Sequence, residues 1–278
     1  MAALRELRKR LRSVRATGQL AGAMRTVATA KFSRVNAMRE AARPYASICS
    51  ELAALSGDAT LSVPPEAAGK PRCAVLFSGN RGLCGAFHSE MTGLFYEHYQ
   101  QATQKPLVVL CGKMATAFCR EHGIAVTREF PFDDVPTFAQ AKCLADFVRQ
   151  LCDDGLVSGV DVYSQRYVNM LRQSPSCCRL VSLEDTAPHA DGDDGILYFP
   201  DRQTVASWLR VRSLETALFT HALEHAAGAQ AATLMAMRSA YDNAEQSAQD
   251  LETTINRRRQ AEVTASIIET ASDVSALE

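Results

Sequence analysis

Apolar residues recur at helical spacing through the first 43 residues of the chain. Steps of mostly three and four residues place them on one face of an α-helix. They are Leu4, Leu7, Leu11, Val14, Leu20, Met24, Val27, Val35 and Met38. The regular spacing breaks once, around Gly18, and Pro44 marks a position where a kink or a restart of the helix is expected.

The last stretch of the chain, residues 229–278, contains neither glycine nor proline. A helix of fifty residues would extend about 75 Å at the standard rise. Its apolar positions alternate in steps of three and four, which is the spacing of a coiled-coil seam. The seam residues are Leu234, Met237, Tyr241, Ala244, Ala248, Leu251 and Ile255.

Between these two helices, short apolar runs alternate with helical segments, which is typical of a parallel-type sheet with helices packed on it. Strands are expected at 73–77, 107–111, 124–130 and 157–168, with 196–199 as a further strand or a connector. Helices are expected at 88–100, 113–121 and 137–152. The stretch 57–72 is rich in Gly, Pro and Ala and is interpreted as a linker.

Each terminal helix is amphipathic and cannot bury its apolar stripe alone, so the simplest arrangement pairs the two, antiparallel if the α/β unit lies at one end. Charge agrees, because residues 1–45 hold eleven Lys or Arg and two Asp or Glu, whereas residues 229–278 hold four and eight. The predicted fold class is α + α/β, a long antiparallel coiled coil with a central Rossmann-like α/β domain. The expected domains are 1–56 (N-terminal helix), 57–72 (linker), 73–205 (α/β domain) and 206–278 (C-terminal helix).

Composition removes several classes of function. The formal net charge is −1, which indicates neither nucleic acid nor a membrane surface as a partner. No run of about 18 apolar residues occurs, so no membrane-spanning helix is expected. The nine cysteines form no CxxC pair, which favours buried, reduced thiols over zinc or disulfides. His221 and His225 lie four residues apart, but two ligands are too few for a metal site.

Three glycines, Gly79, Gly82 and Gly85, follow an expected strand and precede an expected helix, where a phosphate cradle would lie. Their spacing is G-x-x-G-x-x-G instead of G-x-G-x-x-G, and no Walker lysine follows. Nucleotide binding is therefore disfavoured, and a tight turn with a solvated Arg81 is the structural interpretation. We predict no catalytic residue, no metal and no cofactor.

A basic cluster, Asn256-Arg257-Arg258-Arg259-Gln260, interrupts the otherwise acidic last helix. One interpretation is a solvated face that pairs with Glu252 or Glu262 at helical spacing. The other interpretation depends on a resemblance to a known family.

Several segments of the chain resemble the gamma subunits of F-type ATP synthases. LRKRLRSVRATGQLAGAMRTVATAKFSRV (7–35) is similar to the opening helix of that family, through Ser13, Val14, Thr17, Ala23, Met24, Val27, Ala28 and Lys31. FSGNRGLCGAFH (77–88) is similar to the family's S-D-R-G-L-C-G-G-F-N, and residues 235–270 are similar to its closing helix. Arg43-Pro44-Tyr45 matches a following R-P-Y element.

The chain also departs from the family pattern at individual polar positions. The family's S-E-H-A-A-R falls on residues 228–233, which lose three polar residues. Its Asp before R-G-L-C-G is Asn80, and two lysines of the opening helix fall on Gln19 and Gly22.

The resemblance implies a non-catalytic rotor, the central stalk of a proton- or sodium-translocating ATP synthase. Such a subunit couples ion flow through a membrane ring to ATP synthesis or hydrolysis in the catalytic subunits. The implied partners are the alpha and beta subunits of the catalytic ring, the epsilon subunit and the c-ring. The implied location is the cytoplasmic face of the bacterial cell membrane, as a peripheral complex.

The resemblance also implies roles for particular residues. Arg81, at the neck of the shaft, would meet acidic residues of a catalytic subunit. A loop of one catalytic subunit would be contacted at a rotational stop by Arg259, Gln260 and Thr264. The neck and the coiled coil would include Met24, Gly82, Leu83, Cys84 and Gly85.

Two other functions stay open at this point. A Rossmann-like nucleotide-binding enzyme with helical extensions would bind nucleotide directly. A structural or signalling coiled coil would dimerise through its terminal helices alone. Co-purification with alpha and beta subunits would distinguish the rotor from both, and the sequence leaves the coupling ion open.

Overall fold

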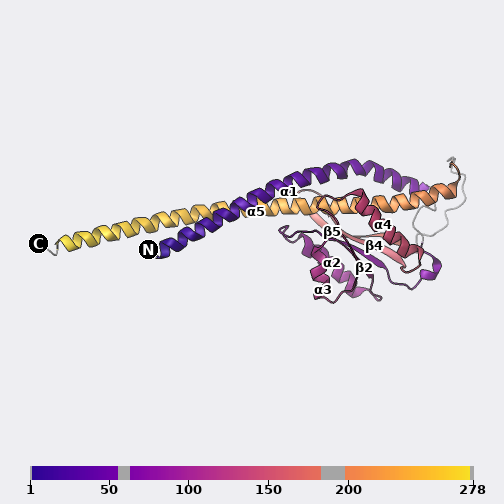
Figure 1. The fold of residues 1–278 in the computed structure, drawn as a ribbon, viewed down its shortest axis with the longest axis horizontal. Coiled ribbons are helices and arrows are strands. Elements are labelled where there is room, and N and C mark those ends of the chain that lie inside the picture. The colour runs from indigo at the N-terminus through magenta and orange to yellow at the C-terminus, as the bar shows by residue number, and fades with distance from the viewer. Residues whose placement is uncertain (1, 56–62, 183–197, 276–278) are drawn as a thin grey trace. The chain divides into compact units, whose positions relative to one another are not determined.

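The computed structural model describes residues 2–55, 63–182 and 198–275. Its elements are α1 (Ala2–Leu55), η1 (Pro65–Ala67), β1 (Cys73–Phe77), α2 (Phe87–Gln101), β2 (Leu107–Cys111), α3 (Met114–Glu121), β3 (Val126–Phe130), α4 (Phe138–Asp153), β4 (Gly159–Tyr167), β5 (Gln173–Ser182) and α5 (Arg202–Ser275) (Figure 1). They form two compact units, Met1–Val27 with Leu234–Glu278, and Ala28–Thr233. The division cuts both long helices, so the domain limits expected above stay a prediction.

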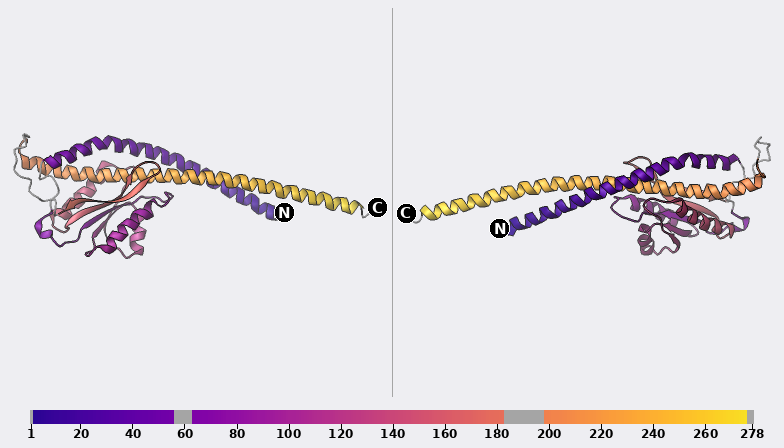
Figure 2. Two further views of the ribbon diagram at one scale, coloured as in Figure 1. Left: turned by 180° about the vertical axis from the view of Figure 1, so that it is seen from behind. Right: turned by 45° about the horizontal axis from the view of Figure 1, so that its top comes forward.

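The first unit is a pair of antiparallel helical segments (Figure 2). Contacts between the two segments join later residues of α1 to earlier residues of α5. Arg15 pairs with Glu252. A Cβ on Gly18 would lie 3.2 Å from Ala244, and a Cβ on Gly22 would lie 3.5 Å from Tyr241. The predicted seam of α5 is confirmed, because Met237, Ala248 and Ile255 are buried and the other seam residues are half-buried.

The predicted seam of α1 is wrong at two positions. Leu20 is 61% exposed and Val27 is 51% exposed, whereas Gly18, Ala21 and Ala28 are buried. Glycine and alanine let two helix backbones approach closely, so these small side chains face inward while the larger ones face solvent. Gly18, where the apolar spacing breaks, is thus a contact residue in the first unit.

The second unit contains a five-stranded sheet of order β3-β2-β1-β4-β5. The first four of these strands pair parallel, and β5 pairs antiparallel with β4 at the edge. The predicted strands and helices between residues 73 and 168 are therefore confirmed, with shorter limits for two strands. The strand β5 was not predicted, because Pro175 interrupts its pattern; proline is tolerated on an edge strand.

Helices cover both faces of this sheet. One face packs Ala74, Leu76, Val108 and Leu110 against α2 and α3. The other packs Val75, Val109 and Val160 against α4 and against Leu214, Leu218 and Ala222 of α5. Because both faces are buried, β1 and β2 are continuous apolar runs, as parallel strands between helical layers are. Thr137 begins α4 with a reciprocal capping box to Gln140.

The second half of α1 packs on the same unit. Val35 is fully buried against Leu223, Ala226 and Ala227 of α5. The helix continues through Pro44 to Leu55, so the expected restart at that residue does not occur. Within the stretch 57–72, only 63–72 is described; Val63 and Ala67 belong to the core there.

Three further expectations concern cysteines, membrane spans and 196–199. Six of the nine cysteines are buried, but Cys143 and Cys177 are exposed and Cys178 is half-buried, so the expectation of buried thiols is wrong for these positions. Within the described residues, no helix combines the length and apolar character needed to cross a bilayer. Residues 196–197 lie outside the described part, and Tyr198 and Phe199 belong to no strand.

Candidate partner-binding site

The glycine-containing loop between β1 and α2 is anchored at its beginning. The backbone N–H of Ser78 donates to Cys111 at 2.7 Å, and the Gly79 carbonyl accepts from the N–H groups of Lys113 and Met114 at 3.2 and 2.9 Å. The Asn80 amide donates to the Phe132 carbonyl at 2.5 Å. These backbone carbonyls and amides are satisfied by neighbouring chain segments, which fixes the direction in which the loop leaves the sheet.

The middle of the loop turns sharply. Leu83 and Gly85 both have left-handed backbone conformations, with φ of 66° and 62°. Leu83 is 58% exposed, whereas Cys84 between them is buried, and burial raises the pKa of its thiol. The loop therefore buries its thiol, and Arg81, Gly82 and Leu83 face solvent.

Arg81 lies beside an acidic residue of its own unit. The side chain is 71% exposed, and its Nε is 3.5 Å from Oδ2 of Asp134. Lys31 of α1 donates to the same oxygen at 2.5 Å. Burial acts to raise the pKa of Asp134, but the Lys31 hydrogen bond and charge, with Arg81 and Asn80, outweigh it and hold that pKa below its usual value. Asp134 thus links the Arg81 loop to α1.

This carboxylate gives a testable dependence on pH. A group whose pKa is lower in the folded state stabilises the fold above its unfolded pKa, and the contribution is lost as pH falls through the folded pKa. We expect Asp134→Asn to lower the free energy of unfolding by roughly 1.5–3 kcal/mol at pH 7. The deficit should shrink below about pH 4, as measured by urea unfolding at several pH values. Asp153→Asn, at an exposed carboxylate on α4, is the control; a deficit independent of pH would contradict the assignment.

The second candidate group lies on the C-terminal part of α5, in the first unit. Arg259, Gln260 and Thr264 are all exposed, as is every residue from 256 to 268. Glu252, one of the two proposed intrahelical partners of the basic cluster, instead pairs with Arg15 of α1. Met24 is half-buried in the same unit, whereas Arg81 and Gly82–Gly85 belong to the second unit. Arg259, Gln260, Thr264 and Met24 thus belong to the first unit, and the Arg81 loop belongs to the second.

Comparison with known proteins decides the family. A family model described as ATP synthase matches residues 3–277. The ATP synthase gamma chain of Desulforamulus reducens is 32% identical over all of this chain and all of that protein. That of Chloroherpeton thalassium is also 32% identical, over all of this chain and 99% of the relative. The chain belongs to the ATP synthase gamma chain family.

The fold of this gamma-family chain agrees with solved structures. A chain of the Euglena gracilis mitochondrial ATP synthase in rotational state 3 matches with a TM-score of 0.70 and 16% identity. The match covers 99% of this chain and 95% of that one. A chain of the Euglena gracilis rotor in rotational state 1 matches with a TM-score of 0.64, over 94% and 99% of the two chains. The predicted combination of long terminal helices and a central α/β domain is confirmed.

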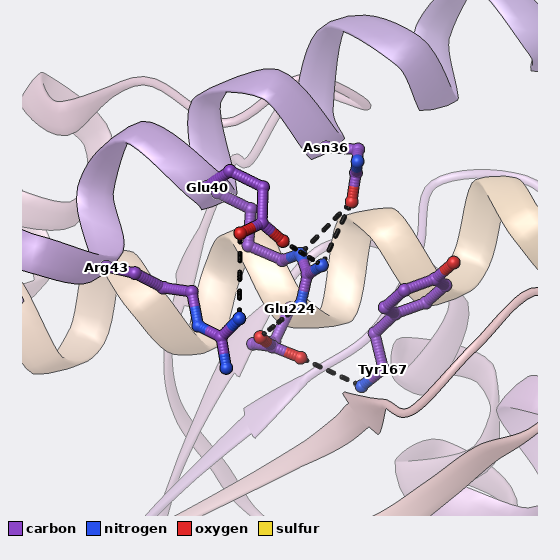
Figure 3. Close-up of polar contacts among 6 residues, drawn as sticks. Asn36, Glu40, Arg43, Tyr167 and Glu224 are labelled. Carbon is purple, nitrogen blue, oxygen red and sulfur yellow. Dashed lines mark hydrogen bonds and ion pairs between the residues drawn. The ribbon is translucent and has the colours of Figure 1, made fainter.

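Sequence analysis of this gamma-family chain missed a buried charged cluster in the second unit (Figure 3). Arg39 of α1 donates to Glu224 of α5 at 3.0 Å, to Asn36 at 3.0 and 3.3 Å and to Glu40 at 2.6 Å. Its guanidinium carbon is 4.8 Å from the centre of the Tyr167 ring. The other oxygen of Glu224 accepts from the Tyr167 backbone N–H at 2.9 Å. The cluster joins both helices to β4.

The two histidines considered as metal ligands face β4 instead. Nδ1 of His221 is 2.8 Å from the Ser164 hydroxyl, and Nδ1 of His225 accepts from the Gln165 backbone N–H at 3.3 Å. Near them, a Cβ on Gly228 would lie 2.9 Å from the Phe87 ring. A side chain at position 228, the first of the family's S-E-H-A-A-R element, would therefore require the Phe87 ring to move.

Proposed function

We propose that the chain is the rotor shaft of a bacterial ATP synthase and couples ion flow through the membrane ring to ATP synthesis or hydrolysis. Full-length similarity to gamma chains supports this proposal most strongly. The chain would act without catalytic residues of its own, on the cytoplasmic face of the membrane. Its partners would be the alpha, beta and epsilon subunits and the c-ring.

The first unit has the surface that a shaft inside a ring of subunits requires. Large apolar side chains face solvent on both of its segments: Leu20, Val27, Val263, Ile267 and Ile268. Apolar side chains left exposed along a helix favour a partner that covers them. The basic cluster around Arg259 lies among them, so an apolar sleeve and an acidic loop would both be contacted.

The Rossmann-like enzyme is the less favoured function. The loop after β1 has neither the glycine spacing nor the lysine of a phosphate cradle. The carboxyl end of β1, where such a sheet would hold a nucleotide, packs its last side chain, Phe77, against His225 of α5. Direct binding of ATP or ADP by the isolated chain, measured by calorimetry, would favour the enzyme over the rotor.

Assembly is the first test of the rotor. The chain is expected to co-purify with alpha and beta subunits when all three are expressed together. Removal of the first unit, by deleting residues 1–27 and 234–278, should prevent that co-purification, because the exposed apolar side chains and the Arg259 cluster proposed to meet the catalytic ring lie there, leaving only the Arg81 contact. Co-purification of the truncated chain at the wild-type level would contradict this placement.

The roles of Arg81 and Arg259 are tested in the assembled complex. A contact made only at some rotor angles biases the cycle, whereas a contact made at every angle does not. Charge-assisted hydrogen bonds contribute roughly 1.5–3 kcal/mol, so Arg81→Ala or Arg259→Ala should change ATP hydrolysis or ATP-driven ion pumping about tenfold. Assembly should stay intact. Arg259→Lys should restore only part of the rate, since an ammonium makes no bidentate bond.

The neighbouring Arg258 provides the matched control. It is exposed on the same helix but lies outside the residues that the family resemblance assigns to the catalytic loop. Arg258→Ala should therefore leave hydrolysis and pumping within about twofold of the wild type. Equal effects of Arg258→Ala and Arg259→Ala would indicate a general effect of charge and would remove the specific assignment.

A further inference from the structure

Two buried polar side chains, His225 and Gln165, and the half-buried His88 meet in the second unit at the carboxyl end of β1. The ring of His225 lies between Phe77, which ends β1, and Phe87, which begins α2, with centroid distances of 6.2 and 5.1 Å. The ring of His88 is 6.3 Å from that of His225. Gln165 of β4 is completely buried beside them. In the sheet, β2 and β4 lie on opposite sides of β1, so the strand order reverses at β1. Open α/β sheets usually bind ligands at the carboxyl end of the strands at such a position.

His225 presents a hydrogen-bond donor at this position. Burial and the neighbouring His88 lower its pKa to about 3, so the ring is neutral near pH 7. Its Nδ1 accepts from the Gln165 backbone N–H, which places the ring proton on Nε2. Within the described residues this Nε2 has no hydrogen-bond partner.

His88 and Gln165 present hydrogen-bond acceptors. Nε2 of His88 is 3.0 Å from the Arg81 carbonyl oxygen, which can only accept, so the proton of the neutral ring is on Nε2 and Nδ1 is an acceptor. The Gln165 amide nitrogen donates to the Phe87 carbonyl at 2.8 Å, which fixes its Oε1 as an acceptor. In the described part of the chain, neither Nδ1 of His88 nor Oε1 of Gln165 has a partner.

We propose that these three atoms bind one internal water molecule, which links α2, β4 and α5. A water oxygen would accept from Nε2 of His225, and its two hydrogens would be donated to Nδ1 of His88 and Oε1 of Gln165. Internal waters typically make about three such bonds to buried polar groups that lack other partners. A buried donor or acceptor left without a partner destabilises the fold. The site belongs to the fold of the chain and does not depend on the proposed function.

The pattern of one donor and two acceptors excludes the other common ligands. A metal ion would meet the N–H of His225 and would have only two ligand atoms, Nδ1 of His88 and Oε1 of Gln165, which is too few for a stable site. An anion would be repelled by those same two acceptors.

A structure of the full chain, free or in the assembled complex, at a resolution that shows ordered water tests the proposal. One density peak is expected at about 2.7–3.2 Å from each of the three atoms. His88→Phe keeps an aromatic ring but removes one acceptor, so the occupancy of the peak should fall at least twofold. His122→Phe is the matched control, since His122 is exposed at the end of α3. In that variant the density peak between the three atoms should have the same occupancy as in the wild type. A wild-type map without the peak, or an unchanged peak in His88→Phe, would overturn the proposal.

Nuclear magnetic resonance of the wild-type chain gives a measurement that needs no variant. With ¹⁵N-labelled histidine at pH 7, His88 and His225 are both expected as neutral rings protonated on Nε2. The Nε2 proton of His225 should show a nuclear Overhauser cross-peak to a water that tumbles with the protein. A proton on Nδ1 of either ring, or the lack of that cross-peak, would reverse the assignment.

Discussion

Alanine in place of Gly112 is expected to lower the free energy of unfolding by roughly 3 kcal/mol or more. Gly112 follows β2 with φ of +99°, and a Cβ there would lie 2.0 Å from the Ser78 carbonyl oxygen and 2.8 Å from its carbon. Neither partner can move freely, because the Ser78 N–H donates to Cys111 at 2.7 Å and the Gly112 N–H donates to Phe130 at 3.1 Å. Relief of the clash would separate the ends of β1 and β2.

A second glycine separates backbone strain from the clash. Gly123 also has a left-handed conformation, with φ of +66°, but a Cβ there would meet nothing within 4 Å. Gly123→Ala should therefore cost only the left-handed strain, roughly 1–2 kcal/mol. Both variants are compared with the wild type by urea unfolding of the full chain. Equal losses of unfolding free energy in the two variants would show that the contact with Ser78 adds nothing to the cost of Gly112→Ala.

Alanine at Arg39 is expected to cost about 3–5 kcal/mol, since it leaves Glu224 without its cation in a mostly buried position. The two side chains are only 10% and 19% exposed. Arg39→Lys should recover only part of the loss, because one ammonium cannot reach Glu224, Asn36 and Glu40 in the geometry of a guanidinium. Chemical unfolding of the full chain is the measurement.

A double-mutant cycle distinguishes this pair from a general loss of packing. Residues in direct contact typically show a coupling energy of about 0.5–3 kcal/mol. The double variant Arg39→Ala/Glu224→Ala should therefore lose less unfolding free energy than the sum of the losses in the two single variants. Arg43 is the matched control, one helical turn further along α1 and 65% exposed beside Glu40. Arg43→Ala should cost at most about 1 kcal/mol. Additive losses at Arg39 and Glu224 would contradict a direct interaction.

Several elements were predictable because their pattern depends on local geometry. A strand buried on both faces has to be apolar at every position, which made 73–77 and 107–111 recognisable. Thr137 and Gln140 form a capping box whose two residues are only three positions apart in the sequence. The C-terminal seam follows from a three-four spacing that only a helix places on one face. Family membership followed from motifs at both ends and in the centre of the chain.

Other features depend on which partner faces a residue. Leu20 and Val27 are apolar and correctly spaced, yet Gly18 and Ala21 occupy the contact in the first unit, because small residues allow the closest approach. The strand β5 contains Pro175 and lacks a clear alternation; its pairing with β4 defines it. Hydrophobic spacing along one segment cannot show either result, since each requires the position of a second segment.

The polar clusters were the features least predictable from the sequence. Arg39 and Glu224 are 185 positions apart, and Lys31 and Asp134 are 103 apart. Each residue alone resembles an ordinary charged position on a helix or loop. The sequence by itself determined the two long helices, the strands and helices between residues 73 and 168, the family and the residues proposed to meet partners, because those depend on local spacing and on motifs. Only the tertiary structure decided which charges are buried together and which atoms of His88, Gln165 and His225 lack a partner, because hydrogen bonding acts over a few ångströms in space.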